Sequence, residues 1–437
     1  MISTPIWDFA EDYRGKAPAR FHMPGHKGKL HLGCEDRDLT EFTGADDLYH
    51  AEGIIAESER NATELFGWPT VYSTEGSSLC IRAMLLLAYQ CSGCKGRILA
   101  GRNAHKTFLN TAILLDFPIR WLWAGNDYLS CPVTPEQVEK AILEEAEKPF
   151  GVYLTSPDYL GNISDIAGIS QVCHRYGVPL LVDNAHGAYL KFLPESRHPM
   201  DLGADYCCDS AHKTLPVLTG GAYLHFRQEG QRQEAKNAMA LFGSTSPSYL
   251  ILQSLDLANP YLEALPRTLQ AFAPRVAALK GRLLARGFAL VGEELLKLTW
   301  VTAPWGYTGE KIGEMLEEKG IYCEFRDEEH IVFMFTPENS HGDLERLSDA
   351  LEAIPKRKAL DKRPPLWVQP RQACTPRQAA LAVREIVPVD ESAGRVLAQA
   401  NVSCPPAVPI VMCGEEIGED LIPILQAYGT ENVEVIK

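Results

Sequence analysis

Short apolar runs alternate with amphipathic stretches through the middle of the chain. The runs have the length of buried strands, and the stretches between them carry helical periodicity. The predicted strands are Gly96–Leu99, Phe150–Leu154 and Val178–Val182, and the predicted helices are Ser58–Phe66, Thr134–Ala146 and Gln171–Tyr176. Repeated alternation of this kind predicts an α/β fold with a mostly parallel central sheet and helices on both faces. Ligands of such folds bind beyond the carboxyl ends of the strands.

The two ends of the chain follow other patterns. The first 55 residues are rich in Gly, Pro, His and charge and have little periodicity, so we expect an extended arm with short turns that packs on something else. We therefore predict an arm over 1–55, an α/β domain over 56–265 and a smaller C-terminal α+β region over 266–437. The elements predicted in that region are helices at Tyr261–Arg286 and Arg377–Glu385, strands at Leu296–Val301 and His330–Phe335, a basic linker at Pro355–Pro365 and a Pro-rich stretch at Ser403–Pro409.

Composition narrows the class of protein. The chain has 437 residues, of which 46% are hydrophobic, and a formal net charge of -15. This charge argues against a broad basic face for nucleic acid. Because there is neither a basic segment followed by an apolar core at the N-terminus nor an apolar run long enough for a bilayer, we expect a cytoplasmic protein without a membrane partner.

Twelve cysteines are too sparse for a disulfide framework in a chain of this length. Cys91 and Cys94 form a lone CxxC, and no second pair stands at the spacing of metal ligands. A structural zinc site needs four ligands, so we expect no metal.

Side chains that could take part in catalysis follow two of the apolar stretches. The run Pro179–Val182 ends in Asp183, with His186 and Gly187 close behind, which places a carboxylate and an imidazole at the end of a strand. Thirty residues later, Lys213 stands among Ser, His and Thr, an unusual setting for a surface lysine. Pyridoxal phosphate (PLP) chemistry needs a lysine for covalent attachment and an anion beside the pyridine nitrogen. Lys213 and Asp183 meet this requirement.

The two segments resemble the fold-type-I PLP enzymes, and Ser-Ala-His-Lys-Thr-Leu-Pro resembles in particular the bacterial ornithine/lysine/arginine decarboxylase family. Other segments resemble that family in the same order, from about residue 20 to about residue 425. They are Phe21–Gly28 with its Pro-Gly-His-Lys signature, Asp46–Gly53, Arg102–Thr107, Ser244–Tyr249 and Pro405–Glu415.

The resemblance implies a role for individual residues. Lys213 would bind PLP, Asp183 would pair with the pyridine nitrogen, and His105 would stack on the ring. His186 would lie near the reacting carbon. The residues expected at the phosphate are Gly76, Ser77, Ser78, Ser210 and His212. Glu415, at the end of the last signature, is the candidate for holding the distal cation of the substrate.

The activity implied is decarboxylation of arginine, lysine or ornithine to an amine and CO2, in polyamine synthesis or in acid resistance. The group that returns a proton to the substrate, Lys213, His212 or another, stays open. The irregular arm predicts a homodimer with shared active sites. Departures from the family pattern at Glu75, Ala407 and Cys413 put substrate and assembly size in doubt, and the chain resembles short members without the extra N-terminal domain.

Two other functions stay open at this point. An aminotransferase of the same fold would use Asp183 and Lys213 equally well, but it would form a keto acid in place of CO2. A non-catalytic homologue could regulate an active partner, and any turnover would exclude it.

Overall fold

A computed structural model describes residues 2–29, 31–123, 125, 128–361, 365–399 and 408–437. The chain forms two compact units, which we describe separately. Unit 1 comprises residues 1–94 and 173–270, and unit 2 comprises 95–172 and 271–437. This division differs from the three consecutive regions predicted above, because the segment 95–172 belongs with the C-terminal part of the chain.

Unit 1 is built on four buried strands in the order β1-β7-β6-β5. β5 (Leu180–Asp183) runs parallel to β6 (Tyr206–Asp209), whereas β7 (Ala222–Phe226) is antiparallel to β6 and to β1 (Thr70–Ser73). The other elements of the unit are α1 (Pro5–Gly15), α2 (Ile54–Phe66), α3 (Gly76–Cys91), η1 (Ala188–Phe192), α7 (Ala211–Thr214), η2 (Glu229–Gln231), α8 (Arg232–Phe242) and the first part of α9 (Tyr249–Ala285). Helix α3 packs on β5, β6 and β7 with an almost wholly apolar central section.

The predicted arm is not irregular throughout, which corrects the expectation for residues 1–55. Helix α1 begins with Pro5 at its first turn and buries Ile6 and Ala10. The side chain of its N-cap residue, Thr4, makes no capping hydrogen bond. Instead, Asp256 on α9 accepts the N–H groups of Ile6 and Trp7, each at 2.9 Å. The signal for this helix is therefore remote in sequence.

The first part of unit 2 contains three parallel strands. β2 (Ile98–Gly101) pairs with β3 (Ile119–Leu122) on one side and with β4 (Gly151–Thr155) on the other. The helices connecting them are α4 (Lys106–Leu115), α5 (Pro135–Glu144) and, after β4, α6 (Ile166–Arg175). Helix α5 starts as predicted, with Thr134 and Gln137 forming a reciprocal capping box. Parallel strands connected by helices confirm the predicted α/β class.

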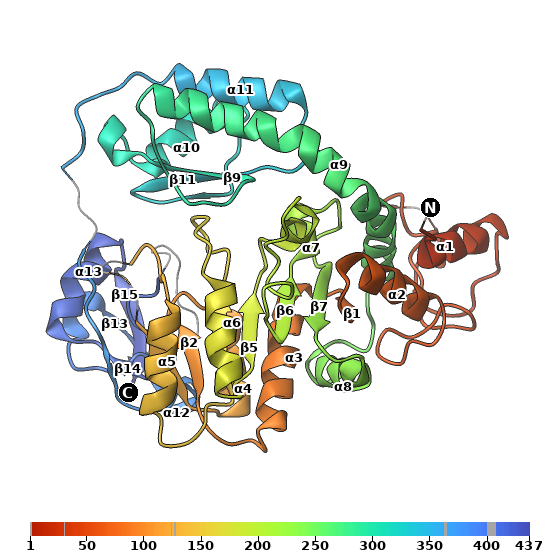
Figure 1. Cartoon of the computed structure of the whole chain (residues 1–437), viewed down its shortest axis with the longest axis horizontal. Helices are drawn as coiled ribbons and strands as arrows, with labels where there is room; N and C mark the ends of the chain where they lie inside the picture. The colour runs from red at the N-terminus through yellow and green to blue at the C-terminus, as the bar shows by residue number, and fades with distance from the viewer. Residues whose placement is uncertain (1, 30, 124, 126–127, 362–364, 400–407) are drawn as a thin grey trace. The chain divides into compact units, whose positions relative to one another are not determined.

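The second part of unit 2 is an antiparallel sheet covered by helices. The strand order is β10-β11-β9-β8. The elements are β8 (Ala289–Val291), β9 (Lys297–Val301), η3 (Ala303–Trp305), α10 (Gly309–Glu317), β10 (Phe325–Arg326), β11 (His330–Met334) and α11 (His341–Glu352). The end of α9 and α11 lie side by side over β9 and β11 (Figure 1), and Arg282 donates to Ser348 at 3.0 Å between these helices.

The C-terminal segment corrects one predicted helix. Of Arg377–Glu385, only the first part is helical, as α12 (Pro376–Leu381). The following β13 (Arg384–Pro388) pairs antiparallel with β15 (Asn432–Ile436), whose partner residues lie about fifty positions away. The remaining elements are β12 (Arg371–Gln372), η4 (Val389–Glu391), β14 (Glu415–Glu416), η5 (Glu419–Leu421) and α13 (Ile422–Ala427). Most of the predicted Pro-rich stretch, 403–407, and residues 362–364 of the predicted linker lie outside the described residues.

Within the described part of the chain, no helix combines the length and the apolar character needed to cross a membrane.

Candidate active site

Asp183 is the last residue of β5 and is almost completely buried. Its Oδ1 accepts the N–H of Ala185 at 3.2 Å and lies 3.6 Å from the sulfur of Cys208, its neighbour on β6. The predicted position at a strand end is confirmed. A buried carboxylate in this place favours a cationic partner, because ionisation without one is costly.

Lys213 lies in the short helix α7, which follows β6 directly. Its Nζ is 3.1 Å from Nε2 of His186, which belongs to the turn after β5. Two residues that are 27 positions apart therefore meet because β5 and β6 are parallel neighbours, whose carboxyl ends lie at the same edge.

Two of the residues expected at the phosphate are in direct contact. Ser210 donates its hydroxyl to Ser77 Oγ at 2.8 Å, beside the first turn of the 16-residue helix α3. The N–H of Gly76 already binds Gly220 O at 2.7 Å. Any phosphate contact here would therefore come from Ser77, Ser210 and the helix terminus, including Ser78, more than from the Gly76 amide.

His212 is held by the backbone of unit 1. Its Nδ1 lies 3.0 Å from Gly221 O, and its own N–H donates to the same oxygen at 3.2 Å. A carbonyl can only accept, so Nδ1 carries a proton and the other ring nitrogen is left for a separate role.

His105 belongs to unit 2, where it caps helix α4. Its Nδ1 accepts the N–H of Thr107 at 3.3 Å and lies 2.9 Å from the Thr107 hydroxyl. Its predicted stacking role stays a prediction.

Glu415, the residue predicted at the distal cation, is in a different environment from the one expected. Its carboxylate is paired with both terminal nitrogens of Arg102, at 2.7 Å for Nη2 to Oε2, and it also accepts the N–H of Met412 at 2.7 Å. The two side chains are 2% and 1% exposed. This arrangement favours a role in holding the C-terminal segment to β2 over contact with a substrate.

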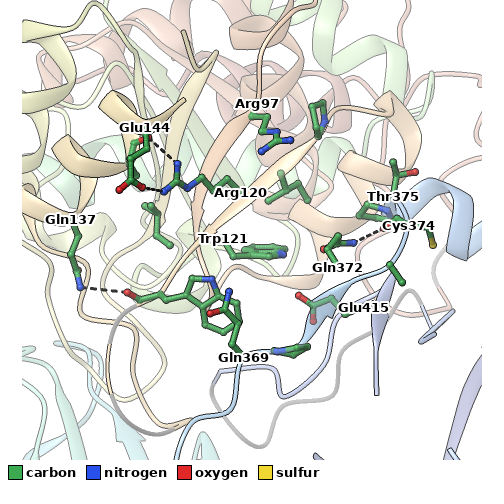
Figure 2. A pocket seen from close by; sticks show the side chains of 18 of the residues that line it. Arg97, Arg120, Trp121, Gln137, Glu144, Gln369, Gln372, Cys374, Thr375 and Glu415 are labelled. Atoms are coloured by element: carbon green, nitrogen blue, oxygen red, sulfur yellow. Dashed lines mark hydrogen bonds and ion pairs between the residues drawn. The ribbon is translucent and has the colours of Figure 1, made fainter. Parts of the chain in front are cut away.

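Figure 2 shows Glu415 on the wall of a cavity of about 780 Å³ in unit 2, together with Trp121 and Gln372. Arg120, which also lines the cavity, is paired with Glu144. Of the residues that the sequence places at cofactor or substrate, Glu415 alone lines this cavity.

One buried cluster was not predicted. Asp209, at the end of β6, binds His198 and His225 through one oxygen and Asn184 through the other. The sequence offers half of the signal, since Asp209 ends an apolar strand as Asp183 does. The histidines come from a loop and from β7, and nothing in their spacing pairs them with Asp209. Cys91 and Cys94 are exposed free thiols and lie outside this cluster.

The departure from the family pattern at Glu75 has a structural counterpart. Glu75 precedes α3, and its carboxylate accepts the N–H of Ser244 at 2.6 Å. It thereby joins two of the segments that carry the family resemblance, the one at the start of α3 and the one at Ser244–Tyr249.

Comparison with known proteins relates most of the chain to one family of decarboxylases. The family model described as Orn/Lys/Arg decarboxylase, major domain, matches residues 4–273, and that for the C-terminal domain matches residues 356–430. An arginine decarboxylase of Bacillus subtilis (strain 168) is 30% identical over 458 residues, covering 96% of this chain and 92% of the relative. An arginine decarboxylase of Halalkalibacterium halodurans is 31% identical over 472 residues, covering 98% and 93%.

Among solved structures, the E. coli constitutive lysine decarboxylase matches with a TM-score of 0.80 at 18% identity, covering 100% of this chain and 82% of that one. The shared fold and the matches to two domains of one family agree. The chain belongs to the Orn/Lys/Arg decarboxylase family and is an amino-acid decarboxylase.

Proposed function

We propose that the protein decarboxylates a basic amino acid with PLP bound to Lys213. The observation that carries this proposal is the contact of 3.1 Å between Lys213 Nζ and His186 Nε2, beyond the ends of β5 and β6. Arginine is the first substrate to test, because the curated relatives that match over nearly their whole length include arginine decarboxylases.

The residues of unit 1 fit the parts of PLP. Lys213 offers a primary amine to the aldehyde, and Asp183 offers a buried carboxylate to the pyridine nitrogen. The Ser77–Ser210 hydroxyl pair at the start of α3 offers donors to the phosphate. When bound, PLP supplies an electron sink for the pair of electrons left when CO2 departs.

The protein's own groups then have defined tasks. A lysine amine attacks a carbonyl only in its neutral form, and His186 Nε2 lies within reach of the proton that Lys213 must release. With PLP bound, Asp183 would keep the pyridine nitrogen protonated, and this would stabilise the negative charge that develops. Lys213 and His212 are the candidates for returning a proton to the substrate carbon.

We also propose that the protein is a cytoplasmic homodimer that shares its active sites. The support is the arm, where Phe21, Leu32 and Met23 are 96%, 88% and 64% exposed in the single chain. Large apolar side chains at this exposure are costly in water, and covering them with a second subunit would remove that cost. The amine product would serve polyamine synthesis or acid resistance.

The proposal is tested first by product analysis. Purified protein is incubated with PLP and, separately, with arginine, lysine and ornithine, and both CO2 and amine are quantified. We expect equal amounts of the two from one preferred substrate. Keto-acid formation without CO2 would establish the aminotransferase alternative, and no turnover with any of the three would contradict the proposal.

The attachment site is tested by trapping. Borohydride reduction of the loaded protein should fix the cofactor on the peptide that contains Lys213, and Lys213→Ala should abolish both label and activity. Lys191→Ala is the matched control, because Lys191 belongs to the same unit and is paired with Asp201. Covalent label that persists in Lys213→Ala would assign the anchor to another lysine.

A further inference from the structure

Asp209 is a buried carboxylate of unit 1 that contacts three polar side chains. Its side chain is fully buried at the end of β6. Oδ1 accepts Asn184 Nδ2 at 2.7 Å, and Oδ2 lies 3.0 Å from His198 Nε2 and 3.1 Å from His225 Nε2. Burial opposes ionisation, but the two imidazoles outweigh it and hold the pKa of Asp209 below its ordinary value. The group is thus a fixed negative charge inside the unit.

The hydrogen bonds fix the direction of each contact. The backbone N–H of Met200 donates to His198 Nδ1 at 3.4 Å, so the proton of this ring is on Nε2 and points at Asp209. His225 Nδ1 lies 2.8 Å from the hydroxyl of Thr70, which anchors the second imidazole to β1. An ionised carboxylate can only accept, so Asp209 also accepts from His225 Nε2, and neither ring can turn without losing a buried hydrogen bond.

The charge of Asp209 also decides how Asn184 is oriented. The amide must turn its Nδ2 toward the carboxylate, because the opposite orientation would place two oxygens together. Asn184 Oδ1 then has no hydrogen-bond partner in the described structure, although the residue is fully buried. This unfavourable state persists because the bond to Asp209 is charge-assisted.

Asn184 is the centre of the turn that follows Asp183. Its N–H donates to Cys208 O at 2.9 Å, and its carbonyl accepts the N–H of Gly187 at 2.8 Å. The side chain fills the space under the turn so closely that a Cβ on Gly187 would lie 1.9 Å from Asn184 Oδ1. His186 is carried by this turn, and its ring meets Lys213 at 3.1 Å.

We propose that Asp209, fixed by His198 and His225, is a positioning residue that sets the Lys213–His186 pair through Asn184. The inference deepens the proposed function, since it concerns the lysine proposed to bind PLP. Asp209 lies on the face of β6 that it shares with Cys207, while Asp183 and Cys208 are register partners on the opposite face. It acts through Asn184 and the turn and not by touching the cofactor.

The same atoms include a set that could ligate a metal, His198, Cys207 and Asp209. The hydrogen bonds favour the positioning role. Burial raises the pKa of the Cys207 thiol well above its ordinary value, so the proton that a metal must displace is firmly held. The thiol lies 3.8 Å from Asp209 Oδ1, as a weak donor to a carboxylate whose other contacts are all donors.

The test measures Lys213 in the cofactor-free protein, so that it does not depend on activity. Formaldehyde with borohydride methylates lysine amines, and mass spectrometry of the Lys213 peptide gives the rate across a pH series. In Asp209→Asn we expect this rate to fall at least fivefold, or its pH midpoint to move. Asn184→Ala should reproduce the effect, because it breaks the link while the imidazoles keep Asp209 satisfied.

Asp256→Asn is the matched control, since it neutralises another buried carboxylate of unit 1, which accepts hydrogen bonds from Ile6, Trp7 and Ser58. Its Lys213 rate should equal that of wild type. The inference is overturned if Asn184→Ala leaves the rate and pH midpoint unchanged, or if Asp256→Asn lowers the rate as much. Asn184→Ala remains decisive where Asp209→Asn fails to fold.

The same samples separate this inference from the proposed function. If wild type is methylated at Lys213 but PLP and borohydride label another lysine, the proposed function fails while the positioning role stands. If PLP labels Lys213 equally fast in wild type and in Asn184→Ala, and methylation agrees, the positioning role fails while the proposed function stands.

Discussion

A carboxylate binds the cation of a substrate strongly only while its charge is not already balanced by another cation. Both oxygens of Glu415 are engaged by Arg102, and the guanidinium lies over the rings of Trp121, Trp123 and Trp367 at 4.9–5.5 Å. Removing one member of a buried ion pair leaves the other charged and uncompensated. A substitution of Glu415 should therefore lower the free energy of unfolding and leave the affinity for the substrate unchanged.

Glu415→Gln should lower the free energy of unfolding by about 3–5 kcal/mol, because Arg102 remains buried without its counter-charge. The measurement is the urea unfolding midpoint, with KM for the preferred amino acid determined beside it. The double variant Arg102→Met with Glu415→Leu should recover part of the loss. A higher KM with unchanged stability would restore the substrate role that the sequence suggested.

Some residues of the candidate site can be found from the local sequence, whereas others depend on partners that are distant in the sequence. The places of Asp183 and Lys213 at the ends of neighbouring strands could be predicted, because each comes at or after an apolar run, while their roles stay predictions. His198 and His225 could not, since they approach Asp209 only when β6 and β7 pair and the loop after η1 folds back. Glu415 was predicted as a functional group, but its partner Arg102 lies 313 positions away.

At the scale of elements, the docking of α1 depends on one acid. Burial raises the pKa of Asp256 to about 6, above the ordinary value of an aspartate, while Ser58 and the N–H groups of α1 partly offset this. Because the pKa of Asp256 is higher in the folded than in the unfolded state, Asp256 contributes most to the free energy of unfolding at pH values below its unfolded-state pKa. That contribution is lost as the pH rises through about 6.

Asp256→Asn should remove this dependence, because an amide oxygen still accepts from α1 and carries no charge. The difference in the free energy of unfolding between variant and wild type, measured by urea titration, should grow in the variant's favour from pH 4 to pH 7, by roughly 1.4 kcal/mol per unit of pKa shift. Taking the difference cancels the other carboxylates that titrate in this range. A constant difference across the series would show that folding does not raise the pKa of Asp256.

Helices and strands were predictable where their own sequence determines them. Thr134, Pro135 and Gln137 specify the start of α5 locally, and the apolar run after Gly177 specifies β5. Helix α1 and strand β13 were missed for the same physical reason, which is that a distant segment decides them. Asp256 caps the former, and β15 pairs with the latter.

At the scale of the whole molecule, a shared site predicts complementation between two inactive variants. His26, which lies 3.1 Å from Asp38 on the arm, would be supplied by one subunit and Lys213 by the other. Refolding a mixture of His26→Ala and Lys213→Ala should give about a quarter of wild-type activity, because half of the dimers are mixed and each has one intact site.

A mixture of Asp183→Ala with Lys213→Ala serves as the control for that experiment. Both residues belong to unit 1 of one chain, so every site in the mixed dimer keeps one defect and activity should stay absent. Activity in the His26→Ala mixture that only adds the two separate residual rates would count against shared sites.

The close approach of Gly187 to Asn184 constrains how this enzyme can diverge from its relatives. Any side chain at position 187 collides with the Asn184 amide, so position 187 can accept a larger residue only after position 184 has become smaller. Once Asn184 is gone, the selective value of an acid at 209 and of histidines at 198 and 225 falls as well. These five positions should therefore change as a group among descendants, with 184 changing first.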